Sequence, residues 1–207
     1  MYRPQDDTWL VAEALAEAGV PAGASVLDAC TGTGALGVVA GLAGAGEVTA
    51  VDISRRAVAA ARVNGWVSGT RVRALRADFG ALVGWRRFDV VLSNPPYVPS
   101  AHDTPRGRAR AWDAGRDGRS VLDRLCATLP FLLTEQGMAL IVHSELCDEE
   151  LTLRQLRDGG LKAAVVARRT VPYGRVLRGR AKWLRDNGYT TAGPDVEELV
   201  VIRADVA

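Results

Sequence analysis

The segment Asn94-Pro95-Pro96-Tyr97 offers an unusual set of groups for chemistry. It follows Phe88–Leu92, an apolar run that is typical of a buried strand. Proline lacks a backbone N–H but keeps its carbonyl, so the two prolines end sheet pairing and leave a stiff turn rich in acceptors. The Asn94 side-chain oxygen and the Pro95 carbonyl could hold the two N–H bonds of a planar amide or amino group, on which Tyr97 could stack.

Methyl transfer to a planar nitrogen requires such a hold. The lone pair of that nitrogen is delocalised, so the group has to be turned out of conjugation and aimed at the methyl carbon. Acceptors on both N–H bonds also stabilise the positive charge that develops on nitrogen. No strong base is needed, because the nitrogen becomes acidic once it is methylated. The turn therefore predicts N-methylation, and a plain strand-terminating turn is the alternative.

Two earlier strand ends carry groups that suit a nucleoside cofactor. In the segment Val26–Gly37, a strand leads through Gly32 and Gly34 into a helix, so the backbone can approach a ligand closely. Asp28 stands where a dinucleotide-binding strand is normally apolar, and its carboxylate suits a cationic amine better than a pyrophosphate. Asp52 ends the second strand, where an acid can accept from both ribose hydroxyls.

A third strand ends in Asp78 and Phe79. Asp78 could accept from an adenine amino group, while Phe79 could donate its backbone N–H or flank the ring. Ribose, adenine and an amino-acid ammonium together specify S-adenosyl-L-methionine. Each acid by itself could be a helix cap or a solvated loop residue. Three acids on consecutive strand ends, behind a Gly-x-Gly turn, favour the cofactor site.

Strands and helices alternate along most of the chain with short connections. This pattern predicts one α/β domain over residues 1–207, with a doubly wound, mostly parallel, Rossmann-like sheet of seven strands. The last two strands are expected to form an antiparallel hairpin at the sheet edge. The expected strands are 25–30, 47–52, 71–78, 87–94, 137–144, 161–171 and 197–205, and the expected helices are 8–18, 35–44, 54–66, 121–133, 148–160 and 179–188.

Composition narrows the class of protein. A net charge of +2 is too small to argue for nucleic acid, and no apolar stretch is long enough for a membrane span. The three cysteines are scattered without a Cys-x-x-Cys pair, which fits reduced thiols in a cytoplasmic protein and predicts no metal site. His143 and Cys126 are expected in the core.

The motifs together resemble the HemK family of class I methyltransferases. The matching motifs, in the family's order and spacing, are VLDACTGTG, VDIS, ADF and NPPY. The opening YRPQDDTWL and the later WDAGRDGRSVLDRL are similar to segments of the short branch that contains the eukaryotic release-factor glutamine methyltransferases. The resemblance implies methylation of a protein glutamine, plausibly in a peptide chain release factor, with S-adenosyl-L-methionine as donor.

The resemblance also implies roles for individual residues. The acceptor would be contacted by Asn94, Pro95 and Tyr97. The cofactor would be contacted by Thr8, Asp28, Cys30, Thr31, Gly32, Gly34, Asp52, Ile53, Asp78, Phe79 and Asn94. Cys30 stands where many relatives have glycine and is expected to be a small apolar spacer.

Two departures from the family bear on the acceptor and its partners. Bacterial members carry an N-terminal helical domain that grips the release factor, whereas here the first expected strand already begins at Ser25. The short branch lacks that domain too and depends on a small zinc-containing partner protein. Residues 172–195 lengthen the last hairpin with basic and aromatic side chains, either as a solvated surface helix or as a docking element for the acceptor.

Three other functions stay open at the level of sequence. The turn could serve a small-molecule N-methyltransferase. It could also serve a nucleic-acid amino methyltransferase, with the arginines of 103–119 and 172–195 on phosphates, although base flipping in duplex needs a larger basic face. A catalytically idle cofactor-binding module is the third, and the intact Asn94–Tyr97 turn argues against it.

Overall fold

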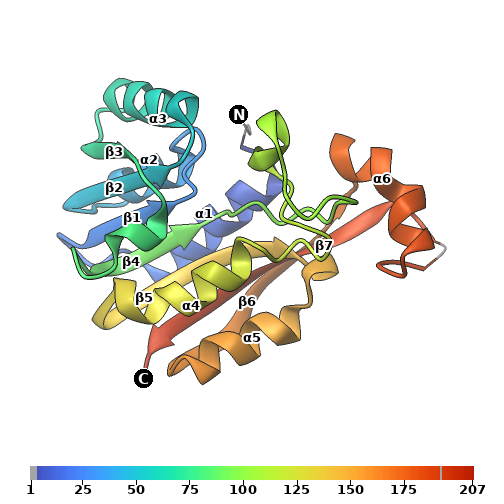
Figure 1. Ribbon diagram of the computed structural model, residues 1–207. Coiled ribbons are helices and arrows are strands. Elements are labelled where there is room, and N and C mark those ends of the chain that lie inside the picture. Colours follow the sequence, from blue (N-terminus) through green and yellow to red (C-terminus); the bar gives the residue numbers. More distant parts are fainter. Residues whose placement is uncertain (1–3, 192) are drawn as a thin grey trace.

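The computed structural model describes residues 4–191 and 193–207 (Figure 1). Tyr2, in the opening motif, lies outside the described residues. The strands form one seven-stranded sheet in the order β3-β2-β1-β4-β5-β7-β6. The strands are β1 (Ser25–Ala29), β2 (Glu47–Asp52), β3 (Val72–Arg76), β4 (Phe88–Ser93), β5 (Leu133–Ser144), β6 (Leu161–Pro172) and β7 (Val196–Val206), and the α-helices are α1 (Asp6–Ala18), α2 (Ala35–Leu42), α3 (Arg55–Val67), α4 (Leu122–Leu132), α5 (Glu149–Asp158) and α6 (Arg175–Asp186).

The sheet is parallel from β3 to β5 and antiparallel at its end. β7 lies between β5 and β6 and runs antiparallel to both. The predicted doubly wound fold and the antiparallel C-terminal hairpin are therefore confirmed. Because β7 inserts between β5 and β6, the edge strand is β6 and not β7, the last strand of the chain.

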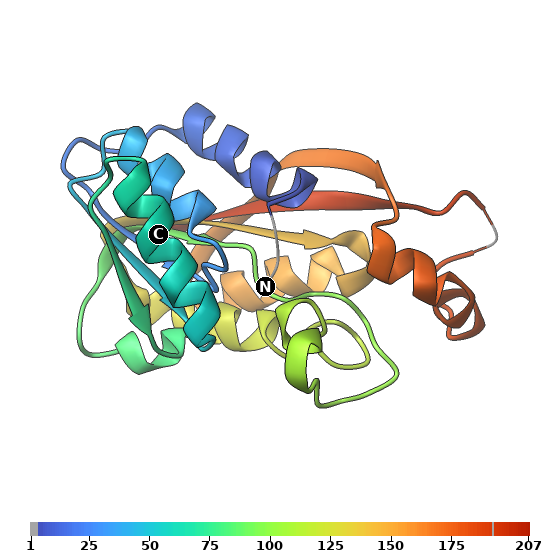
Figure 2. The same ribbon diagram turned by 90° about the horizontal axis from the view of Figure 1, so that it is seen from above.

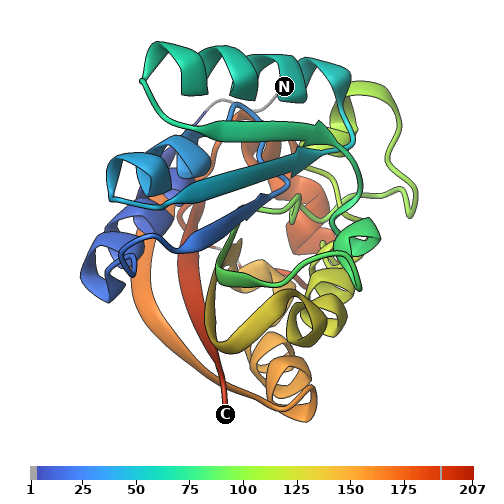
Figure 3. The ribbon, with the colours of Figure 1, turned by 90° about the vertical axis from the view of Figure 1, so that its left-hand side faces the viewer.

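Helices cover both faces of the sheet. Figure 3 shows α1 and α2 on one side and α4 and α5 on the other, while α3 packs against β2 and β3. The central strands β4 and β5 carry the apolar runs Val90–Leu92 and Met138–Val142, where both faces of the sheet are buried. As expected, His143 and Cys126 lie in this core, at 0% and 1% exposure. Burial lowers the pKa of His143 to about 4 and raises that of Cys126 to about 12.

Two elements, β5 and α6, begin four residues earlier than predicted. β5 starts at Leu133, because the ladder to β4 continues past Gly137 with a shift in register. Helix α6 starts at Arg175. The predicted helix begins at Gly179, where glycine interrupts the helical pattern of the sequence, but the observed helix runs through this glycine. The helix is held by the buried stripe Leu177, Ala181 and Leu184, which packs inward at helical spacing.

The chain order reverses at β1, which pairs with β2 on one side and β4 on the other. Parallel strands point their carboxyl ends to the same edge, and ligands bind where such an order reverses. The segments after β1, β2, β3 and β4 therefore meet at one edge. Figure 2 shows α6 and the long loop after β4 beyond the strand ends of the sheet.

Candidate active site

A cavity of about 1250 Å³ opens at the carboxyl ends of β1 to β4. It is lined by twelve of the thirteen expected site residues: Thr8, Asp28, Cys30, Thr31, Gly32, Asp52, Ile53, Asp78, Phe79, Asn94, Pro95 and Tyr97. The thirteenth, Gly34, is not in the lining. It caps α2 with φ +84°, and a Cβ there would lie 2.8 Å from the Ala61 Cα. Close packing against α3 explains this glycine, and a cofactor contact by Gly34 stays a prediction.

Asp28 ties the glycine-rich turn to the end of β1. Its carboxylate is 1% exposed, and Oδ2 accepts from the Thr31 hydroxyl at 2.5 Å and the Gly37 N–H at 2.8 Å. Burial raises the pKa of Asp28 to about 7, although both hydrogen bonds lower it. Oδ2 accepts both hydrogen bonds. With a pKa of about 7 the carboxyl group is partly ionised near neutral pH, and a cation that enters the cavity would favour its charged form.

The turn itself is wound by two residues in the left-handed region, Cys30 (φ 59°) and Gly32 (φ 56°). This conformation favours glycine, so Cys30 occupies a backbone position that side chains rarely adopt. Burial raises the pKa of the Cys30 thiol, so it stays protonated. Asp52 accepts from the Gly32 N–H at 3.0 Å and from the Ser54 N–H at 2.8 Å. Burial raises the pKa of Asp52 as well.

Asp78 and Phe79 both contact Arg124, a residue that is not among the predicted site residues. Arg124, in the first turn of α4, donates to Asp78 Oδ1 at 2.7 Å, and its guanidinium lies 5.3 Å from the centroid of the Phe79 ring. Burial raises the pKa of Asp78, but the bonds from Arg124 and the Gly80 N–H bring it below its ordinary value. One arginine on a helix carries no local signal, so only the packing of α4 assigns it here.

The Asn94–Tyr97 turn is fastened to the first turn of α1. Asn94 Nδ2 donates to the Thr8 hydroxyl at 3.2 Å, and the Tyr97 hydroxyl donates to Asp7 Oδ2 at 2.9 Å. Asp7 is 2% exposed, and its Oδ1 accepts from the Thr8 N–H at 2.6 Å. No residue that the structure describes donates to Asn94 Oδ1. The side-chain amide is thus oriented with its nitrogen toward α1 and its oxygen without a partner.

The far half of the cavity is formed by the loop after β4 and by α6. The Val98 N–H donates to the Trp112 carbonyl at 2.7 Å, which folds the loop back on itself. From α6, Arg180 donates to the Pro99 carbonyl at 2.8 Å and to Asp113 Oδ2 at 3.0 Å. Arg180, within the 172–195 segment, therefore braces the loop rather than lying in solvent.

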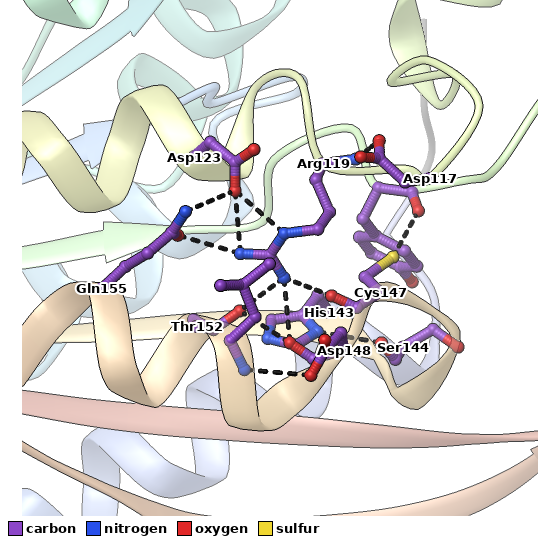
Figure 4. Close-up of polar contacts among 11 residues, drawn as sticks. Asp117, Arg119, Asp123, His143, Ser144, Cys147, Asp148, Thr152 and Gln155 are labelled. Carbon is purple, nitrogen blue, oxygen red and sulfur yellow. Dashed lines mark hydrogen bonds and ion pairs between the residues drawn. The ribbon is translucent and has the colours of Figure 1, made fainter.

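A second arginine, Arg119, lies in the same loop and reaches from it to the start of α5 (Figure 4). It is 2% exposed and donates to the carbonyls of Cys147 and Asp148 and, at 3.0 Å, to the Thr152 hydroxyl. The Cys147 thiol in turn donates to the Tyr97 carbonyl at 2.9 Å. The loop after the turn is thereby joined to the start of α5.

The sequence of residues 5–110 matches the protein family described as "Methyltransferase small domain". The chain belongs to this family. The methyltransferase is 32% identical over 176 residues to a Methanocaldococcus jannaschii protein that carries the name of a protein N5-glutamine methyltransferase, covering 84% of this chain and 87% of the relative. It is 36% identical to a release factor glutamine methyltransferase of Bordetella pertussis, over 77% of this chain but only 62% of that protein.

A solved structure adds a likeness of fold. The Mtq2–Trm112 complex of E. cuniculi, described as responsible for methylating the termination factor eRF1, matches with a TM-score of 0.65 and 22% identity, over 100% of this chain and 98% of that one. The resemblance to the HemK family is confirmed. The methyltransferase is thus an S-adenosylmethionine-dependent N-methyltransferase.

In residues 4–191 and 193–207, no helix is long and apolar enough to cross a membrane. The same residues contain no group of three or more histidine, cysteine or acidic side chains placed to hold a metal ion.

We expect Arg119→Lys to lower the free energy of unfolding by about 3 kcal/mol, because one ammonium cannot replace a buried guanidinium fork and leaves carbonyl oxygens unpaired. Urea denaturation followed by circular dichroism measures this. The matched control is Arg116→Lys, at a side chain that is 67% exposed, and it should change the stability little. Equal losses in the two variants would contradict a supporting role for Arg119.

Proposed function

We propose that the enzyme methylates the side-chain amide nitrogen of a glutamine in a protein, with a peptide chain release factor as acceptor. The observation that carries this proposal is the oriented amide of Asn94, whose nitrogen donates to the Thr8 hydroxyl while its oxygen accepts from no residue that the structure describes. The names of the relatives from Methanocaldococcus jannaschii and Bordetella pertussis support a glutamine acceptor. The chain would act as one cytoplasmic methyltransferase domain.

In this proposal the cofactor lies along the ends of β1, β2 and β3. Asp28 accepts from the cationic amino group, Asp52 from the ribose hydroxyls, and Asp78 from the adenine amino group. Phe79 flanks the adenine on one side. The remaining contacts come from the glycine-rich turn and its neighbours, namely Cys30, Thr31, Gly32 and Ile53. Thr8 acts on the cofactor site indirectly, because its hydroxyl holds Asn94.

The cofactor supplies an electrophilic methyl group on a sulfonium. The protein's part is to hold the acceptor: Asn94 Oδ1 and the Pro95 carbonyl accept the two N–H bonds, which turns the nitrogen lone pair toward the methyl carbon. The same two oxygens stabilise the positive charge on nitrogen as the new C–N bond forms and the S–C bond breaks. The nitrogen then loses one proton to water. Tyr97 is kept against the acceptor amide by its bond to Asp7.

One observation favours a second acceptor class, the amino group of a nucleobase. Arg108, Arg110 and Arg175 all line the acceptor half of the cavity and could contact phosphates. Two buried acids, Asp7 and Glu197, line the same half of the cavity and would repel phosphate groups.

A small activating partner protein also belongs to the proposal, because the solved Mtq2 structure is a complex with Trm112.

Methyl-labelled S-adenosylmethionine tests the acceptor class. The purified enzyme is incubated with this donor and with recombinant release factor from its own organism, and in parallel with total RNA. Label in the release factor, located on a glutamine by mass spectrometry and absent with a Gln→Ala acceptor, is the expected result. Label in RNA alone, removed by nuclease and not by protease, would overturn the glutamine proposal.

Asn94→Ala should reduce kcat by at least about 100-fold, because the variant loses an acceptor that stabilises the charge on nitrogen. The fold and the dissociation constant of the cofactor should change little. Steady-state kinetics, calorimetry and thermal melts measure the three quantities. Asn187→Ala, at an exposed asparagine of the α6 C-cap, is the control. A variant that turns over at the wild-type rate would rule out the role proposed for Asn94.

Cofactor binding should weaken as the pH falls through 7, because the carboxylate of Asp28, with a pKa of about 7, becomes neutral and no longer attracts an ammonium. The dissociation constant, measured by calorimetry, should rise about tenfold from pH 8 to pH 6. Methylthioadenosine, which lacks the amino-acid part, should show no such rise, and Asp28→Asn should abolish it. An unchanged slope in Asp28→Asn would assign the pH effect to another group.

A further inference from the structure

Glu197 is a buried acid that neither the cofactor site nor the Asn94–Tyr97 turn uses. It is the second residue of β7, lies in register with Val171 of β6, and lines the cavity together with Leu199, two residues further on the same face. Its neighbour Glu198 points to the other face and forms an ion pair with Arg168 at 2.8 Å. Two adjacent glutamates thus have opposite environments.

The carboxyl group of Glu197 has no counter-ion. The residue is 6% exposed, and its Oε2 is buried without a hydrogen-bond partner. In the part of the chain that the structure describes, no arginine or lysine forms an ion pair with it. Its electrostatic neighbours are Asp7 from α1 and Glu145 from the turn after β5, while Ser144 is its hydrogen-bonding neighbour. Burial and these acids raise its pKa to about 7.

A buried polar atom that the fold leaves unpaired is costly, so its retention in a cavity points to a ligand. In its ionised form the carboxyl group only accepts, so the ligand atom that it binds in that form is a donor. It cannot belong to the cofactor site, since β7 is separated from β1 by β4 and β5. Glu197 lies on the side of Asp7, which accepts from the Tyr97 hydroxyl of the acceptor turn.

We propose that Glu197 binds a backbone N–H of the acceptor polypeptide beside the target glutamine and thereby determines specificity for a protein acceptor. This inference rests on the proposed function. A carboxylate on a backbone N–H makes a strong, charge-assisted hydrogen bond. The same charge disfavours acceptors that would bring a phosphate close to it. Asn94 and Pro95 would hold the reacting amide, while Glu197 would hold the chain that carries it.

The other titratable groups around Glu197 bear on the test. Cys147 and Tyr173 also interact with it, and burial raises the pKa of both, so they stay protonated near pH 7. Asp7 and Glu145 are the remaining acids. Of this set, only Glu197 is a cavity-lining acid with a buried, unpaired oxygen among the described residues. Replacing Glu197 should therefore remove the pH dependence of the acceptor KM.

The experiment measures release-factor methylation at saturating S-adenosylmethionine for the wild type, Glu197→Gln and the matched control Glu198→Gln between pH 6 and 8.5. In the wild type the acceptor KM should rise about tenfold from pH 8 to pH 6, as the carboxylate is protonated. Glu197→Gln should raise KM about tenfold at pH 8, lose the pH slope, and keep kcat and the cofactor dissociation constant. Glu198→Gln should behave as the wild type.

The outcomes separate this inference from the proposed function. A wild type that methylates the release factor, with an acceptor KM and pH slope unchanged in Glu197→Gln, overturns the inference and leaves glutamine methylation intact. A loss of cofactor affinity or a lower melting temperature that accounts for the raised KM would mean a structural role and also overturns it. If the wild type labels no protein glutamine, the proposed function fails first.

Discussion

Two hydrogen bonds between the first turn of α1 and the turn after β4 set the geometry on which the site depends. Tyr97 and Asp7 are 90 residues apart in the sequence, and Asn94 and Thr8 are 86 residues apart. Each pair nevertheless forms a hydrogen bond, buried in the first pair and partly buried in the second. Without these bonds the Asn94 amide could rotate and its oxygen would face the acceptor only part of the time. Catalysis by positioning is sensitive to such freedom, because small displacements of a reacting group cost large factors in rate.

The site gathers negative charge that the protein itself does not neutralise. Asp28 and Glu197 are buried, and burial raises the pKa of each to about 7. Asp78 has its own cation, Arg124, and a pKa below its ordinary value. The unpaired acids cost stability in the empty protein and gain their partners on binding, an ammonium for Asp28 and a peptide N–H for Glu197 in our proposal. Stability is given up at these positions for recognition.

The loop after β4, which forms part of the far half of the cavity, is held by two arginines, of which Arg119 is buried and Arg180 is partly exposed. Arg119 joins the loop after β4 to the start of α5, and Arg180 joins the same loop to α6. Guanidinium groups suit this task because their several donors satisfy carbonyl and carboxylate oxygens at fixed angles. The lengthened final hairpin is therefore part of the scaffold around the acceptor turn, whatever else it contacts.

The sequence by itself determined the sheet and the cofactor class, and it predicted the Asn94–Tyr97 turn as the acceptor site. These follow from local patterns, since Asp28, Asp52 and Asn94 each end an apolar run and parallel strands bring such ends to one edge. Only the tertiary structure decided what several further side chains contact around the site, because partners far apart in the chain cannot be read from a local pattern. Asp7, Arg119 and Arg124 stand in the quoted motifs, but packing alone brings them to Tyr97, Asp148 and Asp78. Arg180 and Glu197 stand in no motif. The tertiary structure also removed Gly34 from the cavity lining, because that glycine is required where two helices pack too closely for a Cβ.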